Sequence, residues 1–170
     1  MRELLSFPNP VNEVAARTVA AGVVVMSVLY LASGHPLVLV LLAYGFVARV
    51  ASGPRFSPLG LVATKIVAPR LSAHEKLVPG PPKRFAQAIG AVFTISALVA
   101  HLAGWTGLAT VLMAGLVVAA GFEAVIGFCL GCQIFAVLMR VGLIPDEVCA
   151  DCADITRRIA TTSEPADSAA

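Results

Sequence analysis

Four apolar stretches are the feature of this sequence that most limits what the chain can fold into. They cover about residues 14–33, 36–51, 85–103 and 106–127, and none contains more than one Asp, Glu, Lys or Arg. A helix needs about 20 such residues to cross a hydrocarbon core about 30 Å thick. The chain is 58% hydrophobic and only 13% charged, and a small soluble globule has too little interior to bury that much apolar surface. The sequence therefore predicts an all-α polytopic membrane protein with four transmembrane helices.

Short turns predict how these helices connect. Gly34-His35-Pro36 joins the first two stretches and residues 104–107 join the last two, so we expect two helical hairpins. The linker between the hairpins is rich in proline, and its apolar run 59–67 is too short to span a membrane. A short interfacial or re-entrant helix is expected there. Asn12 is the expected N-cap of the first helix.

The basic residues predict the orientation. Neither expected hairpin turn contains any of the twelve Lys and Arg residues, so four spans place every positive charge on one side. The positive-inside rule assigns that side to the cytoplasm, and we expect a bacterial inner-membrane protein with both termini cytoplasmic. Residues 1–160 are expected to form one membrane domain, followed by a polar, disordered tail at 161–170. A net charge of +2 gives no argument for nucleic acid, so the expected partner is the lipid bilayer.

The apolar character continues past the fourth stretch to Leu143. A single helix of that length, rising about 1.5 Å per residue, would be longer than the membrane is thick. Gly127 and Gly131 mark the expected break. The segment after the break is either re-entrant or outside the membrane, and both alternatives place Cys129 and Cys132 at the membrane edge.

The four cysteines form two C-x-x-C pairs separated by sixteen residues, Cys129 with Cys132 and Cys149 with Cys152. This spacing fits a structural zinc site and equally fits two dithiols that exchange a disulfide. Because a helix N-terminus lowers a thiol pKa, Cys129 is the expected nucleophile and Cys132 its resolving partner. The apolar neighbours of this pair would raise the thiol pKa instead. The second pair lies among acidic residues, which disfavour a thiolate and tolerate a cation. A reducing cytosol argues against a permanent structural disulfide, which leaves a bound metal or a cycling dithiol.

Glu123 is the one carboxylate well inside a predicted span. An intramembrane acid is by default a candidate functional residue. We expect it either to pair with Arg17 or Arg49 or to accept a proton from a thiol, and a structural ion pair between helices is the alternative to a functional role. His35 and His101 lie near the predicted hairpin turns and are expected to be interfacial residues rather than metal ligands.

Several motifs together resemble the bacterial membrane family called domain of unknown function 4395. They are the early Asn9-Pro10-Val11-Asn12-Glu13, the Gly80-Pro81-Pro82-Lys83-Arg84-Phe85 entry to the third stretch, and the Gly127-to-Cys132 ending with the later cysteines. The resemblance covers about residues 5–155 and implies an architecture but no established activity.

Members of that family are often encoded near thioredoxin-like or rhodanese-like proteins. The resemblance therefore implies thiol-disulfide redox or sulfur handling with such a partner, carried by Cys129, Cys132, Cys149 and Cys152 with Glu123. The alternative is a non-catalytic membrane protein in which the four cysteines hold zinc. On the first hypothesis no cofactor is required.

Overall fold

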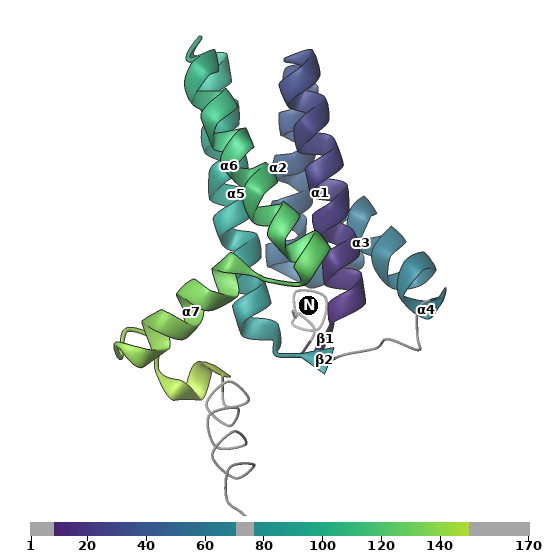
Figure 1. Ribbon diagram of the computed structural model, residues 1–170, viewed down its shortest axis with the longest axis vertical. Coiled ribbons are helices and arrows are strands. Elements are labelled where there is room, and N and C mark those ends of the chain that lie inside the picture. Colours follow the sequence, from purple (N-terminus) through teal and green to yellow (C-terminus); the bar gives the residue numbers. More distant parts are fainter. Residues whose placement is uncertain (1–8, 71–76, 150–170) are drawn as a thin grey trace, which may run out of the picture.

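A computed structural model describes residues 9–70 and 77–149 of the chain. Four long helices run side by side, as Figure 1 shows: α1 (Glu13–Ser33), α2 (Pro36–Ser52), α5 (Gly80–Leu102) and α6 (Thr106–Ile126). Within the described residues, four helical segments are long and apolar enough to cross a membrane. The prediction of an all-α polytopic membrane protein with four transmembrane helices is confirmed.

Local sequence signals explain where these helices begin and end. The Asn12 side chain accepts hydrogen bonds from the backbone N–H groups of Val14 (2.8 Å) and Ala15 (3.3 Å), so it caps α1 as predicted. Gly34 and Gly127 end α1 and α6 in the left-handed conformation, with φ of 65° and 73°. Glycine adopts this conformation without steric cost. The hairpin turn after α1 and the break after α6 therefore follow from the sequence.

The third long helix begins at Gly80 rather than at the predicted Phe85. Two prolines occupy its first turn, where a missing N–H costs nothing because the first N–H groups of a helix have no intrahelical partner. Immediately before it, β2 (Leu77–Val78) pairs antiparallel with β1 (Val11–Asn12). This pairing, which the sequence did not predict, brings the start of α1 next to the start of α5.

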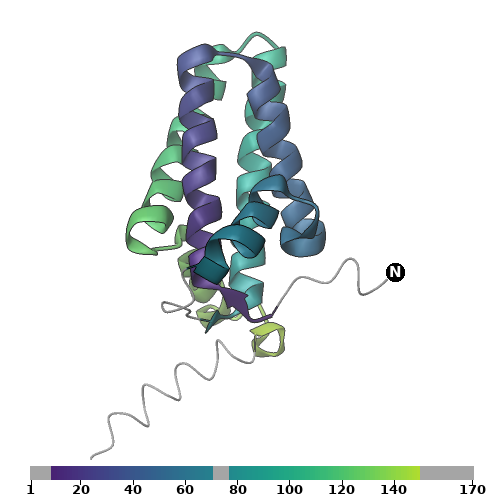
Figure 2. The same ribbon diagram turned by 90° about the vertical axis from the view of Figure 1, so that its right-hand side faces the viewer.

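The linker after α2 contains the short helical segment that the sequence predicted. It consists of a 3-10 turn, η2 (Gly53–Arg55), then α3 (Pro58–Val62), a π-helical turn η3 (Ala63–Val67) and α4 (Ala68–Arg70). Figures 1 and 2 show this segment beside the half of α1 farther from the hairpin turns. It packs against the bundle because Ala63 is fully buried and Leu59 lies directly against Gly22.

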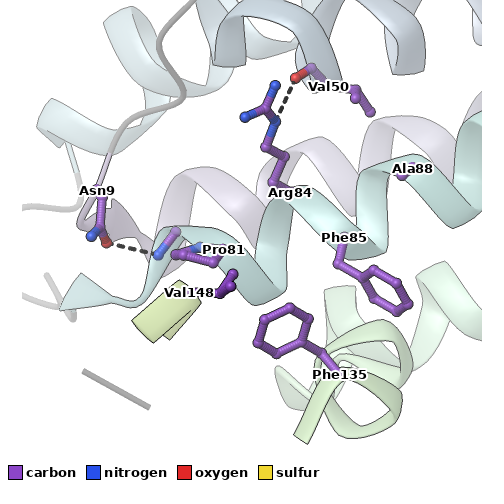
Figure 3. Close-up of a pocket in the computed structure, with 9 residues that line it drawn as sticks. Asn9, Val50, Pro81, Arg84, Phe85, Ala88, Phe135 and Val148 are labelled. Atoms are coloured by element: carbon purple, nitrogen blue, oxygen red, sulfur yellow. Dashed lines mark hydrogen bonds between the residues drawn. The ribbon is translucent and has the colours of Figure 1, made fainter. Parts of the chain in front are cut away.

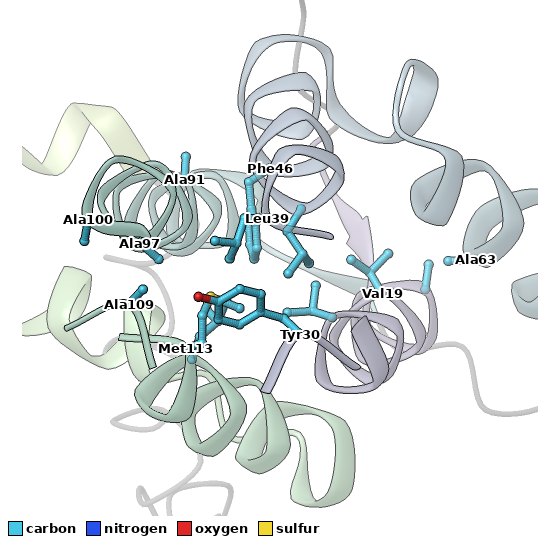
Figure 4. Packing of buried hydrophobic residues seen from close by; sticks show 14 of the residues in the cluster. Val19, Tyr30, Leu39, Phe46, Ala63, Ala91, Ala97, Ala100, Ala109 and Met113 are labelled. Atoms are coloured by element: carbon cyan, nitrogen blue, oxygen red, sulfur yellow. The ribbon is translucent and has the colours of Figure 1, made fainter. Parts of the chain in front are cut away.

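Small residues lie at several helix contacts, in a core that also contains large side chains such as Leu39 and Met113 (Figure 4). Ala97 and Ala109 are both 0% exposed where α5 meets α6, and Gly90 of α5 lies directly against the Phe46 ring of α2. Small side chains let helix backbones approach closely in a membrane, where no hydrophobic force drives helices together. Large apolar residues also cover the outside, as at Val111, which is 68% exposed. An apolar exterior of this kind suits contact with lipid.

The chain leaves the bundle after α6 at the end opposite the hairpin turns (Figures 1 and 2). It continues as α7 (Leu130–Arg140) and a 3-10 turn, η5 (Asp146–Cys149). The predicted break therefore occurs at Gly127, whereas Gly131 lies inside α7 and does not interrupt it. Cys152 and the predicted tail 161–170 lie outside the described residues.

Candidate functional site

The first cysteine pair lies at the start of α7. Cys129 is the N-cap residue of that helix, and Cys132 follows within its first turn. Both are free thiols; Cys129 is 7% exposed and Cys132 is half-buried. Residues three apart share a helix face, and this face packs on α5 because Phe135, one turn further along, meets Phe85 with ring centroids 5.6 Å apart.

The glycine between the two cysteines fixes how closely α7 approaches α5. A Cβ atom at Gly131 would lie 2.5 Å from the Cβ and 2.6 Å from the Cα of Ala86. Ordinary carbon contacts are about 3.5–4.0 Å, so only glycine fits here without moving one of the helices. The sequence suggested a helix-breaking role for Gly131, but the structure shows that its role is close packing.

Glu123 forms an ion pair with Lys83, not with Arg17 or Arg49. The Lys83 Nζ atom lies 2.5 Å from the Glu123 Oε1 atom, and the two side chains are 9% and 14% exposed. The prediction was wrong because it placed Lys83 in the linker. The two prolines extend α5 backward, so Lys83 lies in its first turn and reaches the last part of α6.

The two arginines proposed as partners of Glu123 have other roles. Arg17 donates hydrogen bonds to the carbonyl oxygens of Ala124 (3.2 Å) and Val125 (2.6 Å), and so caps the C-terminal end of α6. Arg49 donates to Gln87 of α5 and to the Ser57 hydroxyl that begins α3. Both arginines thus tie together segments that are far apart in the sequence.

The Lys83–Glu123 ion pair influences the pKa values of the two thiols. The Cys132 thiol donates a hydrogen bond to the Cys129 sulfur, and this bond lowers the pKa of Cys129 below its ordinary value. Lys83 acts in the same direction, whereas burial and the Glu123 carboxylate oppose it. The same hydrogen bond, together with burial, raises the pKa of Cys132. Cys129 is therefore the group that ionises first, and its thiolate is stabilised by a donor and a cation.

The second cysteine pair is only partly described. Cys149 is buried in η5 and is disulfide-bonded, whereas the sequence analysis expected a bound metal or a cycling dithiol rather than a permanent structural disulfide. Cys152 lies outside the described residues, so the meeting of the two pairs stays a prediction. Within residues 9–70 and 77–149, no three or more His, Cys, Asp or Glu side chains are grouped closely enough to hold a metal ion.

The predicted interfacial histidines lie at the opposite end of the bundle from the thiols. His35 caps α2 by accepting a hydrogen bond from the Leu37 N–H group. The His101 ring is hydrogen-bonded to the hydroxyl of the buried Tyr30, with 3.0 Å between Nδ1 and the phenolic oxygen. His101 therefore joins α5 to α1 and is more than a surface residue.

Two cavities lie at the same end of the bundle as the thiols. The larger, about 460 Å³, lies between α2, α5 and the α7–η5 segment, and Figure 3 shows Arg84, Phe85 and Phe135 around it. The smaller, about 170 Å³, lies between α1, α2, α3 and α5 and is lined by Arg49 and Lys83 among others. Lys83 thus borders the smaller cavity and also influences the thiols.

A comparison with known protein families identifies the family of the chain. A family model described as Domain of unknown function (DUF4395) matches residues 11–140. The chain belongs to this family. The DUF4395 match includes all four long helices, Lys83, Glu123 and the first cysteine pair, and it ends before Cys149. No curated protein and no solved structure is significantly similar to the chain.

Lys83 is the site residue that the sequence analysis missed. A signal for it exists in the Gly80-Pro81-Pro82 motif that carries the DUF4395 resemblance, because consecutive prolines are tolerated in the first turn of a helix. With α5 begun at Gly80, the hairpin places Lys83 and Glu123 at the same end of neighbouring antiparallel helices. Because Lys83 and Glu123 would then lie at the same depth in the membrane, an ion pair between them would be expected.

Proposed function

We propose that this DUF4395 protein is a membrane thiol-disulfide exchanger, in which Cys129 and Cys132 react with a soluble thioredoxin- or rhodanese-like protein. One observation carries the proposal: two free, hydrogen-bonded thiols lie at the start of α7 with their ionisation biased toward Cys129. A low thiol pKa beside a second cysteine is typical of reactive rather than structural cysteines.

The proposed reaction moves two electrons from the chain to its partner. The Cys129 thiolate attacks one sulfur of the partner's disulfide, that bond breaks, and the other partner sulfur leaves as a thiolate. Cys132 then gives its proton to the Glu123 carboxylate and attacks the Cys129 sulfur of the mixed disulfide. The second partner sulfur also leaves as a thiolate, so the chain carries a Cys129–Cys132 disulfide. The two partner thiolates take up one proton from Glu123 and one from water, and the partner ends as a dithiol.

The state of Cys149 supports an extension of this reaction. Cys149 is disulfide-bonded while Cys129 and Cys132 are free thiols. On this proposal the second pair, Cys149 with Cys152, is the one with which the first pair exchanges. The alternative zinc site needs all four cysteines as thiolates, so a disulfide at Cys149 favours the redox proposal.

We further propose that the thiol end of the bundle faces the cytoplasm of a bacterial cell, in the inner membrane. The supporting observation is that neither residues 18–48 nor residues 85–139, which include both hairpin turns, contain any Lys or Arg. The basic residues of the described helices gather at the other end, as the positive-inside rule requires of a cytoplasmic face. Labelling His35→Cys in a variant without the native cysteines tests this. Protection from an impermeant reagent in intact cells would reverse the orientation.

A trapping experiment tests the redox proposal. The Cys132→Ala variant, purified in detergent, is mixed with oxidised thioredoxin and analysed on a non-reducing gel. We expect a mixed disulfide through Cys129, because the resolving thiol is missing, and none from the matched Cys129→Ala variant. Bound zinc is measured on the wild-type protein in parallel. One tightly held zinc per chain with unreactive thiols, or the absence of any mixed disulfide, would overturn the proposal.

A further inference from the structure

The helix α7 exposes an apolar face on its outer side. Four aliphatic side chains of α7, counting its C-cap residue, are between 38% and 63% exposed: Leu130, Ile134, Val137 and Val141. They follow one another at spacings of four, three and four residues, and residues three or four apart share a helix face. The four side chains therefore form one row along the helix, which we call the apolar stripe.

The other two sides of α7 have different surroundings. Phe135 is buried and meets Phe85, so one side packs on α5. Gln133 and Arg140 are exposed and lie seven residues apart, which places them together on a third side, the polar row. The outer surface of α7 is therefore amphipathic, with the apolar stripe between the polar row and the side that packs on α5.

The apolar stripe continues the surface of the last span. Val125 and Ile126 at the end of α6 are exposed, and so is Phe128 in the connection to α7. With 21 residues, α6 rises about 31 Å, enough to cross a hydrocarbon core about 30 Å thick. Only residues 127–129 separate α6 from α7, and Figure 1 shows α7 running obliquely outward from that end of the bundle. The helix therefore begins at the boundary of the hydrocarbon core.

The chemistry of this outer surface fits lipid better than a protein partner. The apolar stripe contains only Leu, Ile and Val, whereas the centres of protein interfaces are enriched in aromatic residues, Met and Arg. The polar row includes Arg140, and α7 contains no Asp or Glu, so its charge complements anionic headgroups. A re-entrant α7 would place Gln133 and Arg140 in hydrocarbon, where a charged side chain is costly.

We propose that α7 lies on the surface of the bilayer that the four long helices cross, with the apolar stripe inserted at the boundary between headgroups and acyl chains. Amphipathic interfacial helices bury their apolar face about 5–10 Å into this boundary. The polar row then faces the headgroups and water, and Cys129 and Cys132 are held at the membrane surface. The proposal concerns the location of α7 alone. It rests neither on the redox reaction nor on which end of the bundle faces the cytoplasm.

Fluorescence quenching in vesicles tests this location. Single-cysteine variants of a chain without the native cysteines are labelled with an environment-sensitive fluorophore and reconstituted with phosphatidylcholine and phosphatidylglycerol, with iodide on both sides of the membrane. Ile134→Cys reports on the apolar stripe. Ala136→Cys is the matched control, because it is also exposed and lies about 200° further round the helix. Val118→Cys, exposed in the middle of α6, is the reference for a position facing the acyl chains.

We expect the Ile134 label to be quenched by a lipid that carries its spin label near the headgroup, and the Ala136 label by iodide. The Val118 label should respond most to a spin label deep in the acyl chain. Iodide quenching at Ile134 without lipid quenching would show that the apolar stripe faces water and would overturn the proposal. Deep lipid quenching at both Ile134 and Ala136 would show a re-entrant helix. Protection of Ile134 from both quenchers would show that a protein surface, such as a second copy of the chain, covers it, and either result also overturns the proposal.

A second measurement keeps the native cysteines, because two of them lie at the start of α7. Benzoylphenylalanine is introduced at Ile134 or at Ala136 in the otherwise native chain, and the vesicles are irradiated. We expect a phospholipid adduct, seen as added mass, from position 134 and little from position 136. No adduct at 134, or equal adducts at both positions, contradicts the proposed location. This readout does not involve the thiols, so its result is independent of the trapping experiment.

Discussion

The contact between Gly131 and Ala86 allows a quantitative test of how α7 holds the thiol pair. In Gly131→Ala the added Cβ atom would lie 2.5 Å from the Ala86 Cβ atom and 2.6 Å from its Cα atom. Normal carbon contacts are about 3.5–4.0 Å, so the two helices must separate by about 1 Å. The Ala86 Cα and Cβ atoms are fixed to the backbone of α5 and are not the end of a flexible side chain, so they have little freedom to give way.

The expected cost follows from two opposing terms. Overpacking of this kind costs about 1–3 kcal/mol, while alanine favours the helical conformation over glycine by up to about 1 kcal/mol. The net destabilisation of the docked α7 is therefore about 1–2 kcal/mol. At about 1.4 kcal/mol per factor of ten, the undocked population rises about 5- to 30-fold. Because α7 projects from the bundle, the four long helices should retain their thermal stability.

The assay is alkylation of Cys129, which is 7% exposed when α7 is docked. Where opening is fast relative to modification, the alkylation rate follows the open population, so Gly131→Ala should react about 5- to 30-fold faster than wild type. Gly121→Ala is the matched control, because a Cβ at Gly121 of α6 meets nothing within 4 Å. Equal rates for Gly131→Ala and wild type at one pH would refute the close packing of α7 on α5.

Three further predictions follow from individual contacts. Lys83→Met should raise the pH midpoint of Cys129 alkylation and Glu123→Gln should lower it, because the lysine favours and the carboxylate disfavours the thiolate; the wild-type midpoint should lie below that of an ordinary cysteine. Arg17→Gln removes the charged donor that caps α6 and should lower the free energy of unfolding by about 1.5 kcal/mol. Asn12→Ala removes the cap of α1 and should cost about 1 kcal/mol, seen as a lower Tm.

A control substitution or comparison accompanies each of these three predictions. Arg140→Gln removes a charge from the exposed end of α7 and should leave the Tm nearly unchanged. Asn12→Asp keeps the capping oxygen and should keep most of the stability. A pH midpoint that moves the same way in Lys83→Met and Glu123→Gln would contradict the electrostatic account, because the two changes remove opposite charges.

The sequence predicted the features of this fold that depend on local pattern. Apolar length determined the four spans, Asn12 determined the start of α1, and Gly127 determined the break that separates α7 from α6. The start of α5 was less well predicted, since Pro81 and Pro82 are compatible with both a loop and a first helical turn. Because of that local ambiguity, Lys83 was predicted to lie in the linker instead of α5, and Arg17 or Arg49 was predicted as the partner of Glu123 instead of Lys83.

What the sequence determined by itself is therefore a membrane bundle of two hairpins with a cysteine pair just beyond its last span, because hydrophobic length and glycine conformation are properties of single segments. What only the tertiary structure decided is which charges meet. Lys83 faces Glu123, Arg17 caps α6 and Arg49 donates to Gln87, because each contact joins residues on different helices. Their pairing depends on helix rotation and depth, which the spacing along one chain does not specify.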